Sequence, residues 1–421
     1  MPESRDVVIT GMGVVCPLGV GTDAYWAALE AGVSGIELLF DPPHPGLPYR
    51  YVSRIKNYDA KEYVQPRKTL KVMCEAIQAA YGAASMAAAQ GKIEKGTVEP
   101  ERFGVVLGSE VLYGELDELK GVFSREEGND ESEIAHWSGK VFRELFPLWM
   151  LKYLPNMAAC HISIAHDARG PNNSIIAGPT SSLAAVIEAA ENIRRGHADV
   201  MLAGGSGAIS ALSCIPFRGY KQLSKWEGEP AGASRPFDAR RSGLVPGEGT
   251  GLFLLEARES AERRGAPILA RLAGMASCFE PRVGAAPLQG TAIKQSIERS
   301  LATAKMKPSD IGHVNAHGES SPVQDRLEAM AIRQTLGDVP VTAPKSFFGD
   351  LGGGAGAVEM IASVLALQHS RVPYTLNYEE PDPACPVNVV HGRPLAVGKS
   401  TALVLNQAPT GQAVAVVIAR E

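Results

Sequence analysis

Residues 170–195 read GPNNSIIAGPTSSLAAVIEAAENIRR, and this stretch decides the fold. Ser174–Ala177 ends a short apolar run, and Gly178 and Pro179 interrupt it. Pro179 suits the first turn of a helix, where its missing N–H would have no intrahelical partner. Beyond it, apolar side chains recur at helical spacing, at Leu183, Val186, Ile187, Ala190 and Ile193. The stretch therefore predicts a strand, a sharp turn and a helix that begins near the proline.

Short apolar runs alternate with helical stretches through the rest of the first 257 residues. The first apolar run is expected to end at Gly11 and Gly13 and to lead into a Gly/Pro turn. Strands that alternate with helices indicate a layered α/β protein with a central sheet. Strands are expected at Val7–Thr10, Phe103–Leu107, Asp199–Ala203 and Gly251–Leu255, and helices at Thr22–Ala31, Lys68–Met86 and Ser182–Arg195.

A second series of the same kind follows. Its strands are expected at Ile268–Leu272, Ile311–Ala316, Thr401–Leu405 and Ala413–Ile418, and its helices at Ile293–Ala304 and Gly356–Leu367. We interpret the chain as two related halves, residues 1–257 and 258–421, which join near the charged stretch Arg258–Ala266. The polar, acidic run Ser124–Lys140 predicts a surface insertion in the first half, over about residues 110–150.

Composition excludes several classes of protein. The chain of 421 residues has a net charge of -5, so it lacks the basic field of a nucleic-acid binder. No apolar run approaches the roughly 18 residues of a membrane span, and no signal-peptide pattern occurs. The six cysteines form no CxxC pair and do not lie near a histidine at zinc-ligand spacing, so no metal site is expected. We expect a soluble cytoplasmic protein with reduced thiols.

Several motifs in order resemble the β-ketoacyl synthase family of the thiolase superfamily. The resemblance covers most of the chain and implies a thiolase-like fold, with two βαβαβαββ halves in an αβαβα layered sandwich. It also implies a dimer, with an interface along Asp199–Ala203. Besides the GPN segment, the motifs are VVITGMGVVCPLG (residues 7–19), LPNMAACHISI (154–164), RRGHADVMLAGG (194–205), ASRPFDARRSGLVPGEGTGLFLLE (233–256), VNAHGESSPVQDRLEAMAI (314–332) and KSFFGDLGGGAGAVEMI (345–361).

The resemblance also assigns catalytic positions. Enzymes of this family carry the acyl group on a cysteine, use two histidines for decarboxylation and bond formation, and support the second histidine with a lysine. His317 matches the first histidine, Lys345 the lysine and Glu359 a supporting helix glutamate. The cysteine position holds Pro179, and the second histidine position holds Asp350.

These departures predict a loss of the usual condensation chemistry. Pro179 has no nucleophilic atom, and it lacks the backbone N–H that forms half of the oxyanion hole, a donor worth about 3 kcal/mol. An aspartate at position 350 would oppose the enolate that a histidine stabilises. The family's Gly/Phe-rich loop, which supplies the other oxyanion donor, is replaced by Asn406–Gly411, where Ala408 is the expected substrate contact.

Three functions remain open. The first is a non-condensing homologue in fatty acid or polyketide chain elongation, similar in kind to a chain length factor. It would bind acyl carrier protein, form a homodimer or a heterodimer with an active ketosynthase, and need no cofactor, with acyl-pantetheine as its possible ligand. The second is a hydrolase or lyase that uses His317 with Asp350 or Thr180, although helix N-terminal capping or a first-turn hydrogen bond is the simpler role for Thr180. The third is an acyl-binding scaffold. Glu319, where the family has a small hydroxyl residue, is expected beside His317, as an ion-pair partner or a substrate contact.

Overall fold

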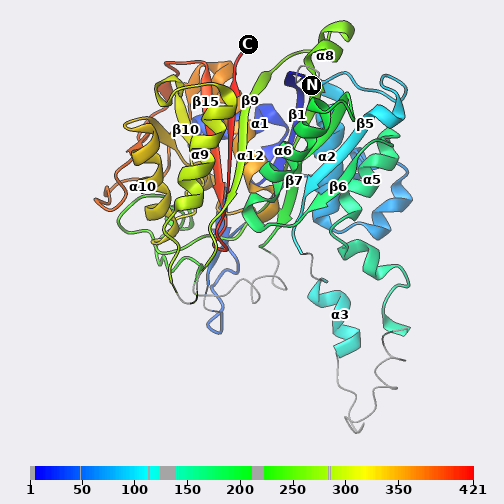
Figure 1. Ribbon diagram of the computed structural model, residues 1–421. Helices are drawn as coiled ribbons and strands as arrows, with labels where there is room; N and C mark the ends of the chain where they lie inside the picture. Colours follow the sequence, from blue (N-terminus) through cyan, green and yellow to red (C-terminus); the bar gives the residue numbers. More distant parts are fainter. Residues whose placement is uncertain are drawn as a thin grey trace.

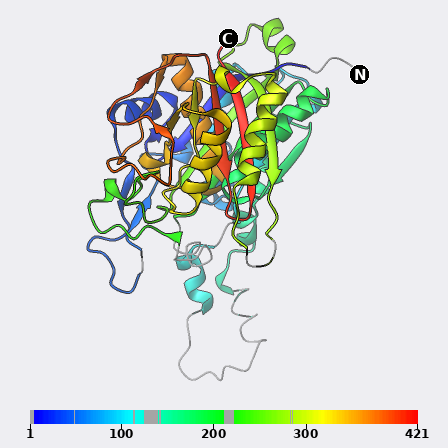
Figure 2. The same cartoon turned by 60° about the vertical axis from the view of Figure 1, so that its left-hand side comes forward.

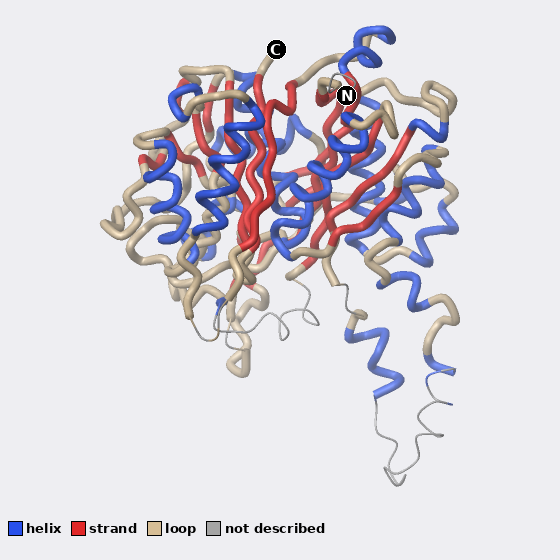
Figure 3. Tube along the Cα trace, viewed as in Figure 1, coloured by secondary structure: helices blue, strands red, loops and turns tan. Residues whose placement is uncertain are grey.

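The computed structural model describes residues 5–47, 49–111, 114–123, 139, 141, 143–210, 222–282, 284 and 286–421. The run predicted to form a polar insertion loop, Ser124–Lys140, lies outside these residues except for Gly139. Within the described chain, twelve strands form one mixed sheet, and helices pack on both of its faces (Figures 1 and 3). None of the described helices is both long enough and apolar enough to cross a bilayer.

The sheet contains two groups of five strands that follow the same order. Across the sheet, the first group is β6 (Asn172–Ile175), β5 (Phe103–Gly108), β7 (Val200–Ala208), β8 (Glu248–Ala257) and β1 (Val7–Cys16). The second group is β11 (Pro340–Thr342), β10 (His313–Asn315), β15 (Thr401–Gln407), β16 (Gln412–Ala419) and β9 (Ala270–Phe279). When the strands of each group are numbered along the chain, both orders read 3-2-4-5-1. β1 and β9 join the groups by antiparallel pairing.

Helices form layers between and outside the two groups. α6 (Ser181–Arg194) and α12 (Ala355–His369) lie in the middle, and each contacts strands of both groups (Figure 1). Thirteen of the fifteen residues of α12 are buried, which is typical of a helix covered on all sides. The outer helices are α2 (Glu75–Gln90) and α5 (Met157–His166) beside the first group, and α9 (Thr291–Ala304) and α10 (Gln324–Leu336) beside the second. This is the layered α/β sandwich that the sequence predicts.

Shorter elements complete the described chain. In Figures 1 and 2 the cyan helix α3 (Leu116–Phe123), in the region of the expected insertion, lies well below the layered body. The other α-helices are α1 (Thr22–Ala31), α8 (Arg258–Arg264) and α11 (Lys345–Phe348). The 3-10 helices are η1 (Ala60–Glu62), η2 (Arg67–Val72), η3 (Pro100–Arg102), η4 (Trp149–Tyr153), η5 (Gly178–Thr180), η7 (Pro230–Gly232), η8 (Pro308–Asp310) and η9 (Gly352–Gly354). The minor strands are β2 (Gly19–Val20), β3 (Ile36–Leu38), β4 (Tyr51–Ser53), β12 (Arg371–Val372), β13 (Asn388–Val389) and β14 (Leu395–Ala396).

β1 is longer than the sequence suggests. The prediction that it ends at Gly11 is wrong, because the strand continues to Cys16 through a register shift next to β8. The glycines serve packing instead of a turn. A Cβ at Gly11 or Gly13 would lie 2.0 Å from a backbone carbonyl oxygen of α2, so the strand and the helix touch only because these side chains are absent.

The helix predicted at Lys68–Met86 is divided in two. Arg67–Val72 forms η2, and α2 begins only at Glu75 because Met73 and Cys74 adopt extended backbone conformations. Met73 is buried, so the break brings an apolar side chain into the core. Glu75 in the first turn favours the helix start through its negative charge.

The strand expected to form a dimer interface cannot pair with another chain. All of Asp199–Ala203 except Asp199 lies in β7, which is hydrogen-bonded to β5 on one side and to β8 on the other. The placement of the interface along this strand is therefore wrong. β6 is the strand at that end of the described sheet.

Candidate functional site

The segment around Pro179 forms the strand, turn and helix that the sequence predicts. β6 ends at Ile175, η5 makes one turn, and α6 starts at Ser181. Gly178 has φ +59°, in the left-handed region that glycine adopts without strain. Pro179 is buried in the first turn, where a helix does not require its N–H.

Thr180, the hydroxyl residue next to Pro179, makes local hydrogen bonds. Its Oγ1 donates to the carbonyl oxygen of Ala177 at 2.8 Å and lies 3.2 Å from Oε1 of Gln412. The side chain is fully buried. Neither bond reaches His317, so the contacts support the first-turn structural role of this hydroxyl rather than a nucleophilic one.

An open cleft of about 550 Å³ lies beside Pro179. The residues that line it come from η5 and its approach, from the hairpin between β15 and β16, and from one further loop. Neither a thiol nor a titratable side chain occurs among these described lining residues, so they offer an acyl thioester contacts but no cysteine-type nucleophile. The lining residues are Ile176, Ala177, Gly178, Pro179, Gln222, Ala408, Pro409, Thr410 and Gln412.

Ala408, the expected substrate contact, follows β15 and uses its backbone within the hairpin. Its N–H donates to the carbonyl oxygen of Gln412 at 2.8 Å, and its own carbonyl oxygen accepts the N–H of Gly411 at 2.9 Å. The next residue, Pro409, has no N–H. The N–H of Ala408, in the loop where the resemblance expects the second oxyanion donor, is therefore already bound within the chain.

Four fully buried polar side chains, here called the buried polar cluster, converge from four segments: His317, Lys345, Glu359 and Asn406. Nζ of Lys345 lies 3.0 Å from Nδ1 of His317 and forms an ion pair with Glu359. Nδ2 of Asn406 donates to Oε2 of Glu359 at 2.7 Å and lies 3.4 Å from Nδ1 of His317. The cluster thus connects the loop after β10, α11, α12 and β15.

Burial controls protonation in the buried polar cluster. It lowers the pKa of His317 well below the usual value; Lys345 acts in the same direction and Asp350 in the opposite one. Burial also raises the pKa of Glu359 to about 7, although Lys345 and Asn406 lower it. His317 is therefore a neutral imidazole near pH 7.

Both ring nitrogens of His317 are engaged within the protein. Nδ1 faces the nitrogen donors of Lys345 and Asn406, so it acts as an acceptor and we assign the ring hydrogen to Nε2. Nε2 lies 3.4 Å from Oε2 of Glu319, a side chain that is only 7% exposed. A neutral imidazole has one donor and one acceptor, and both are in use here.

Asp350 lies near the buried polar cluster but is not the direct partner of His317. It sits between α11 and η9 and is buried. Its N–H donates to the carbonyl oxygen of Val245 at 2.8 Å, and its Oδ1 accepts the N–H of Gly352 at 3.1 Å. Its charge acts on His317 electrostatically, whereas the hydrogen bond of His317 Nε2 goes to Glu319.

Backbone anchors fix the loop that carries His317. Glu328 of α10 accepts the N–H groups of His317 at 2.7 Å and Gly318 at 2.9 Å. Gly318 and Ser320 have φ values of +40° and +68°, so the loop passes twice through the left-handed region. Oγ of Ser320 accepts the N–H of Arg235 at 3.0 Å. Burial raises the pKa of Glu328 to about 8.

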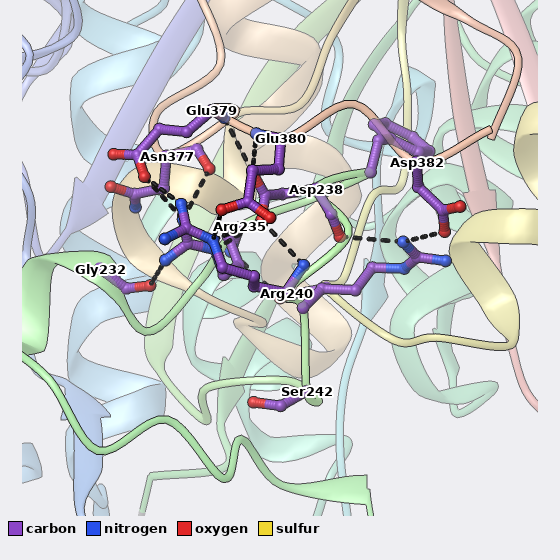
Figure 4. A network of polar contacts seen from close by, with 12 residues as sticks. Gly232, Arg235, Asp238, Arg240, Ser242, Asn377, Glu379, Glu380 and Asp382 are labelled. Carbon is purple, nitrogen blue, oxygen red and sulfur yellow. Dashed lines mark hydrogen bonds and ion pairs between the residues drawn. The ribbon is translucent and has the colours of Figure 1, made fainter. Parts of the chain in front are cut away.

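The segment that begins with Arg235 contacts the His317 loop through hydrogen bonds and contacts residues 377–382, as Figure 4 shows. Asp238, fully buried, accepts the N–H of Glu379 at 2.8 Å and Nε of Arg235 at 3.0 Å. Arg241 contacts Asp382 at 2.7 Å and also donates to backbone carbonyls of the His317 loop. These buried charges have opposite charges or backbone groups as partners, as buried charges require.

Sequence reasoning did not identify Asn406 and Glu328 as site residues. Asn406 ends the apolar run of β15, and a polar residue at that place is a signal for a buried partner. Glu328 lies on the buried face of α10 beside Ala329 and Ile332, where an acidic residue likewise needs a partner. The sequence does not show that these partners are the supports of His317.

The described site offers hydrogen bonds and apolar contacts. Within the described residues, no group of three or more His, Cys, Asp or Glu side chains is placed to hold a metal ion. His317, Lys345 and Glu359, which the resemblance assigns to family positions, meet in the buried polar cluster, while Pro179 and Ala408 line the cleft. The buried polar cluster thus contains charged side chains, whereas the described residues that line the cleft are neutral.

Two family patterns match the chain: the beta-ketoacyl synthase N-terminal domain at residues 4–261, and the beta-ketoacyl synthase C-terminal domain at residues 269–379. A 3-oxoacyl-[acyl-carrier-protein] synthase 2 of Synechocystis is 32% identical over 409 residues, which cover 95% of this chain and 94% of that protein.

Solved structures also match over the whole chain. A type II polyketide synthase acyl-carrier protein in complex with its ketosynthase, bound to the hexaketide, contains a chain that is 27% identical, with a TM-score of 0.85 and 100% of both chains covered. The ishigamide ketosynthase/chain length factor is 25% identical, with a TM-score of 0.86 and the same coverage. The fold is therefore that of the thiolase-like ketosynthases.

Proposed function

Because the chain belongs to the beta-ketoacyl synthase family, we propose that it acts in fatty acid or polyketide chain elongation as a non-condensing subunit, similar in kind to a chain length factor. The observation that carries this proposal is Pro179. It occupies the start of the helix at the family's cysteine position, beside an open cleft, and provides neither a nucleophile nor a backbone N–H.

Two further contacts support the loss of condensation. Pro179 has no N–H, and in the loop that replaces the family's second oxyanion donor the N–H of Ala408 is bound to Gln412 inside the hairpin and Pro409 has none. The retained His317 uses Nδ1 for Lys345 and Asn406 and Nε2 for Glu319. General base or acid chemistry at this ring would first have to break one of these bonds.

Two matched structures support the proposed partners. One matched structure contains a ketosynthase with its acyl-carrier protein, and another is a ketosynthase/chain length factor. We propose that this chain likewise pairs with a ketosynthase that retains its cysteine and both histidines, and that the cleft beside Pro179 receives the acyl-pantetheine of a carrier protein. A homodimer is the alternative assembly.

A condensation assay tests the proposal. Purified protein is incubated with radiolabelled malonyl-carrier protein and an acyl-carrier protein donor, first alone and then with a cysteine-containing ketosynthase from the same organism. We expect no 3-oxoacyl product from the chain alone and a change in product length or yield when both proteins are present. A 3-oxoacyl product from the chain alone would refute the non-condensing role.

An electrophilic acyl-pantetheine crosslinker provides the matched control. The wild-type chain should remain unlabelled at the cleft, whereas Pro179→Cys should be labelled, because the substitution places a thiol at the start of α6, where the helix dipole favours the thiolate. Labelling of the wild-type cleft would point instead to a cryptic nucleophile.

The same experiments test two alternative functions. A hydrolase or lyase built on His317 would release free acid or a cleaved acyl product, and this activity would disappear in His317→Ala. The contacts of Thr180 and of both ring nitrogens weigh against it. An acyl-binding scaffold would bind acyl-pantetheine but would not change the products of any ketosynthase.

A further inference from the structure

We propose that Glu319 is a positioning residue that keeps His317 closed to ligands, because its carboxylate occupies the one ring nitrogen that would otherwise bind a thioester carbonyl. This inference deepens the proposed function and rests on it. It assigns the inactivity of the retained histidine to a single side chain, one that the catalytic positions Pro179 and Asp350 do not include.

The backbone directs Glu319 at the ring. The residues on either side of it, Gly318 and Ser320, both have left-handed φ values, so the chain turns sharply at Glu319. Glu328 holds the N–H of Gly318, and the N–H of Arg235 holds the hydroxyl of Ser320. With both neighbours anchored, the position of the Glu319 backbone is fixed.

The ring offers Glu319 only one nitrogen. Nδ1 of His317 lies 3.0 Å from Nζ of Lys345 and 3.4 Å from Nδ2 of Asn406, and these donors define it as the acceptor. Nε2 therefore carries the hydrogen, and Oε2 of Glu319 at 3.4 Å is its acceptor. The side chain of His317 is 1% exposed, so water does not compete effectively for this bond.

A shorter residue at position 319 would change the chemistry of this nitrogen. Threonine has no carboxylate that reaches Nε2. The buried N–H of His317 would then have no hydrogen-bond acceptor, which costs free energy unless another acceptor binds. The carbonyl oxygen of an acyl thioester is such an acceptor. Glutamine, in contrast, has nearly the length of glutamate and retains one side-chain oxygen that can accept the same hydrogen.

Nitrogen-15 NMR of histidine-labelled protein tests the inference, with His317→Asn used to assign the resonance. In the wild type we expect an Nε2-protonated ring whose hydrogen exchanges slowly with solvent. Glu319→Thr should increase the exchange rate at least tenfold, and Glu319→Gln should stay within about threefold of the wild type. Glu319→Ser provides a second short variant in case the threonine variant does not fold.

The same samples are then titrated with S-octanoyl-pantetheine. The probe should shift the His317 resonance in the folded Thr or Ser variant and leave the wild type unchanged. Wild-type exchange rates in both short variants, or an equal shift in the wild type, would overturn the role of Glu319. A 3-oxoacyl product from the unaltered chain would refute the proposed function instead, so the two failures are distinguishable.

Discussion

The buried polar cluster and the cleft beside Pro179 respond differently to sequence change. In the cluster, charged and polar side chains from four segments contact one another with little solvent between them. Among the described residues that line the cleft the side chains are neutral, and a substituent at Gly178 would meet no described atom within 4 Å. Substitutions on the cleft side are therefore expected to leave the protein folded, whereas substitutions in the buried polar cluster are expected to reduce the stability of the whole fold.

The largest expected effect is in the buried polar cluster. Glu359→Ala would leave Lys345 as a buried charge without its ion-pair partner, and breaking such a pair costs about 3–5 kcal/mol. Urea denaturation should show this loss in the free energy of unfolding. Glu298→Ala is the matched control, since it breaks the exposed 3.9 Å pair with Lys294 and should cost less than about 1 kcal/mol. Equal losses would contradict the contrast between interior and surface.

The next largest effect should come from replacing a glycine with alanine, which should cost more stability beside the buried polar cluster than beside the cleft. A Cβ at Gly356 would lie 2.0 Å from Oδ1 of Asn406 and 2.7 Å from Cγ of Leu183, so Gly356→Ala should cost about 3 kcal/mol through overpacking. Gly178→Ala meets open space and only the strain of its φ of +59°, about 1 kcal/mol. Thermal and urea unfolding of both variants measure the difference. If Gly178→Ala were the more damaging variant, the cleft would be more tightly packed than the described contacts indicate.

The pH dependence of stability should change when Glu328, which anchors the His317 loop, is replaced. Burial raises the pKa of Glu328 from 4.5 to about 8. Between these values the folded chain retains a proton that the unfolded chain has released, so raising the pH through this window favours unfolding. Glu328→Gln cannot titrate and should lose less stability between pH 5 and 8, with a difference on the order of 2 kcal/mol.

Urea titrations at each pH unit measure this difference. Burial also raises the pKa of Asp325 to about 7, and the charge of Asp325 contributes to the raised pKa of Glu328, so both carboxyls titrate in the wild type and only Asp325 titrates in the variant. For the surface variant Glu298→Gln, the plot of the free energy of unfolding against pH should run parallel to that of the wild type. Parallel curves for Glu328→Gln would mean that Glu328 is ionised in the folded chain throughout the range.

The smallest expected effect is on the cleft side. Thr180→Val removes the hydrogen bond to Ala177 and the contact with Gln412, and it should cost about 1 kcal/mol. Differential scanning calorimetry should detect a decrease of a few degrees in Tm. A loss comparable to that of Glu359→Ala would show that the first turn of α6 carries more of the fold than its contacts suggest.

Local signals in the sequence predict most of the layered fold. The bounds of α1 agree with the prediction, and α6 differs by one residue at each end, because a glycine or a proline marks where each helix starts. β1 and α2 differ for a tertiary reason. Gly11 is required for contact between strand and helix, and the break before Glu75 places Met73 in the core. Neither requirement can be read without knowing which segments meet.

The site was predictable as a set of positions and not as a network. Motif spacing is enough to relate His317, Lys345 and Pro179 to the family pattern. Glu319 is predicted beside His317 and lies 3.4 Å from its Nε2. Spacing does not show, however, that the N–H of Ala408 donates within its own hairpin, or that Asn406 and Glu328 support the ring and its loop. Loop conformation determines which hydrogen bonds form, and the residue types alone constrain loop conformation only weakly.

The position of β1 has a consequence for how the chain is made. It is synthesised before β8, where Val7 pairs with Ala257, and before β9, where Val8 pairs with Arg271, and these are its long-range strand partners. At typical rates of synthesis these partners emerge on the order of tens of seconds later. During that interval an apolar ten-residue segment lacks its β8 and β9 partners, so nascent chains of this protein should depend on chaperones until both strands have been translated.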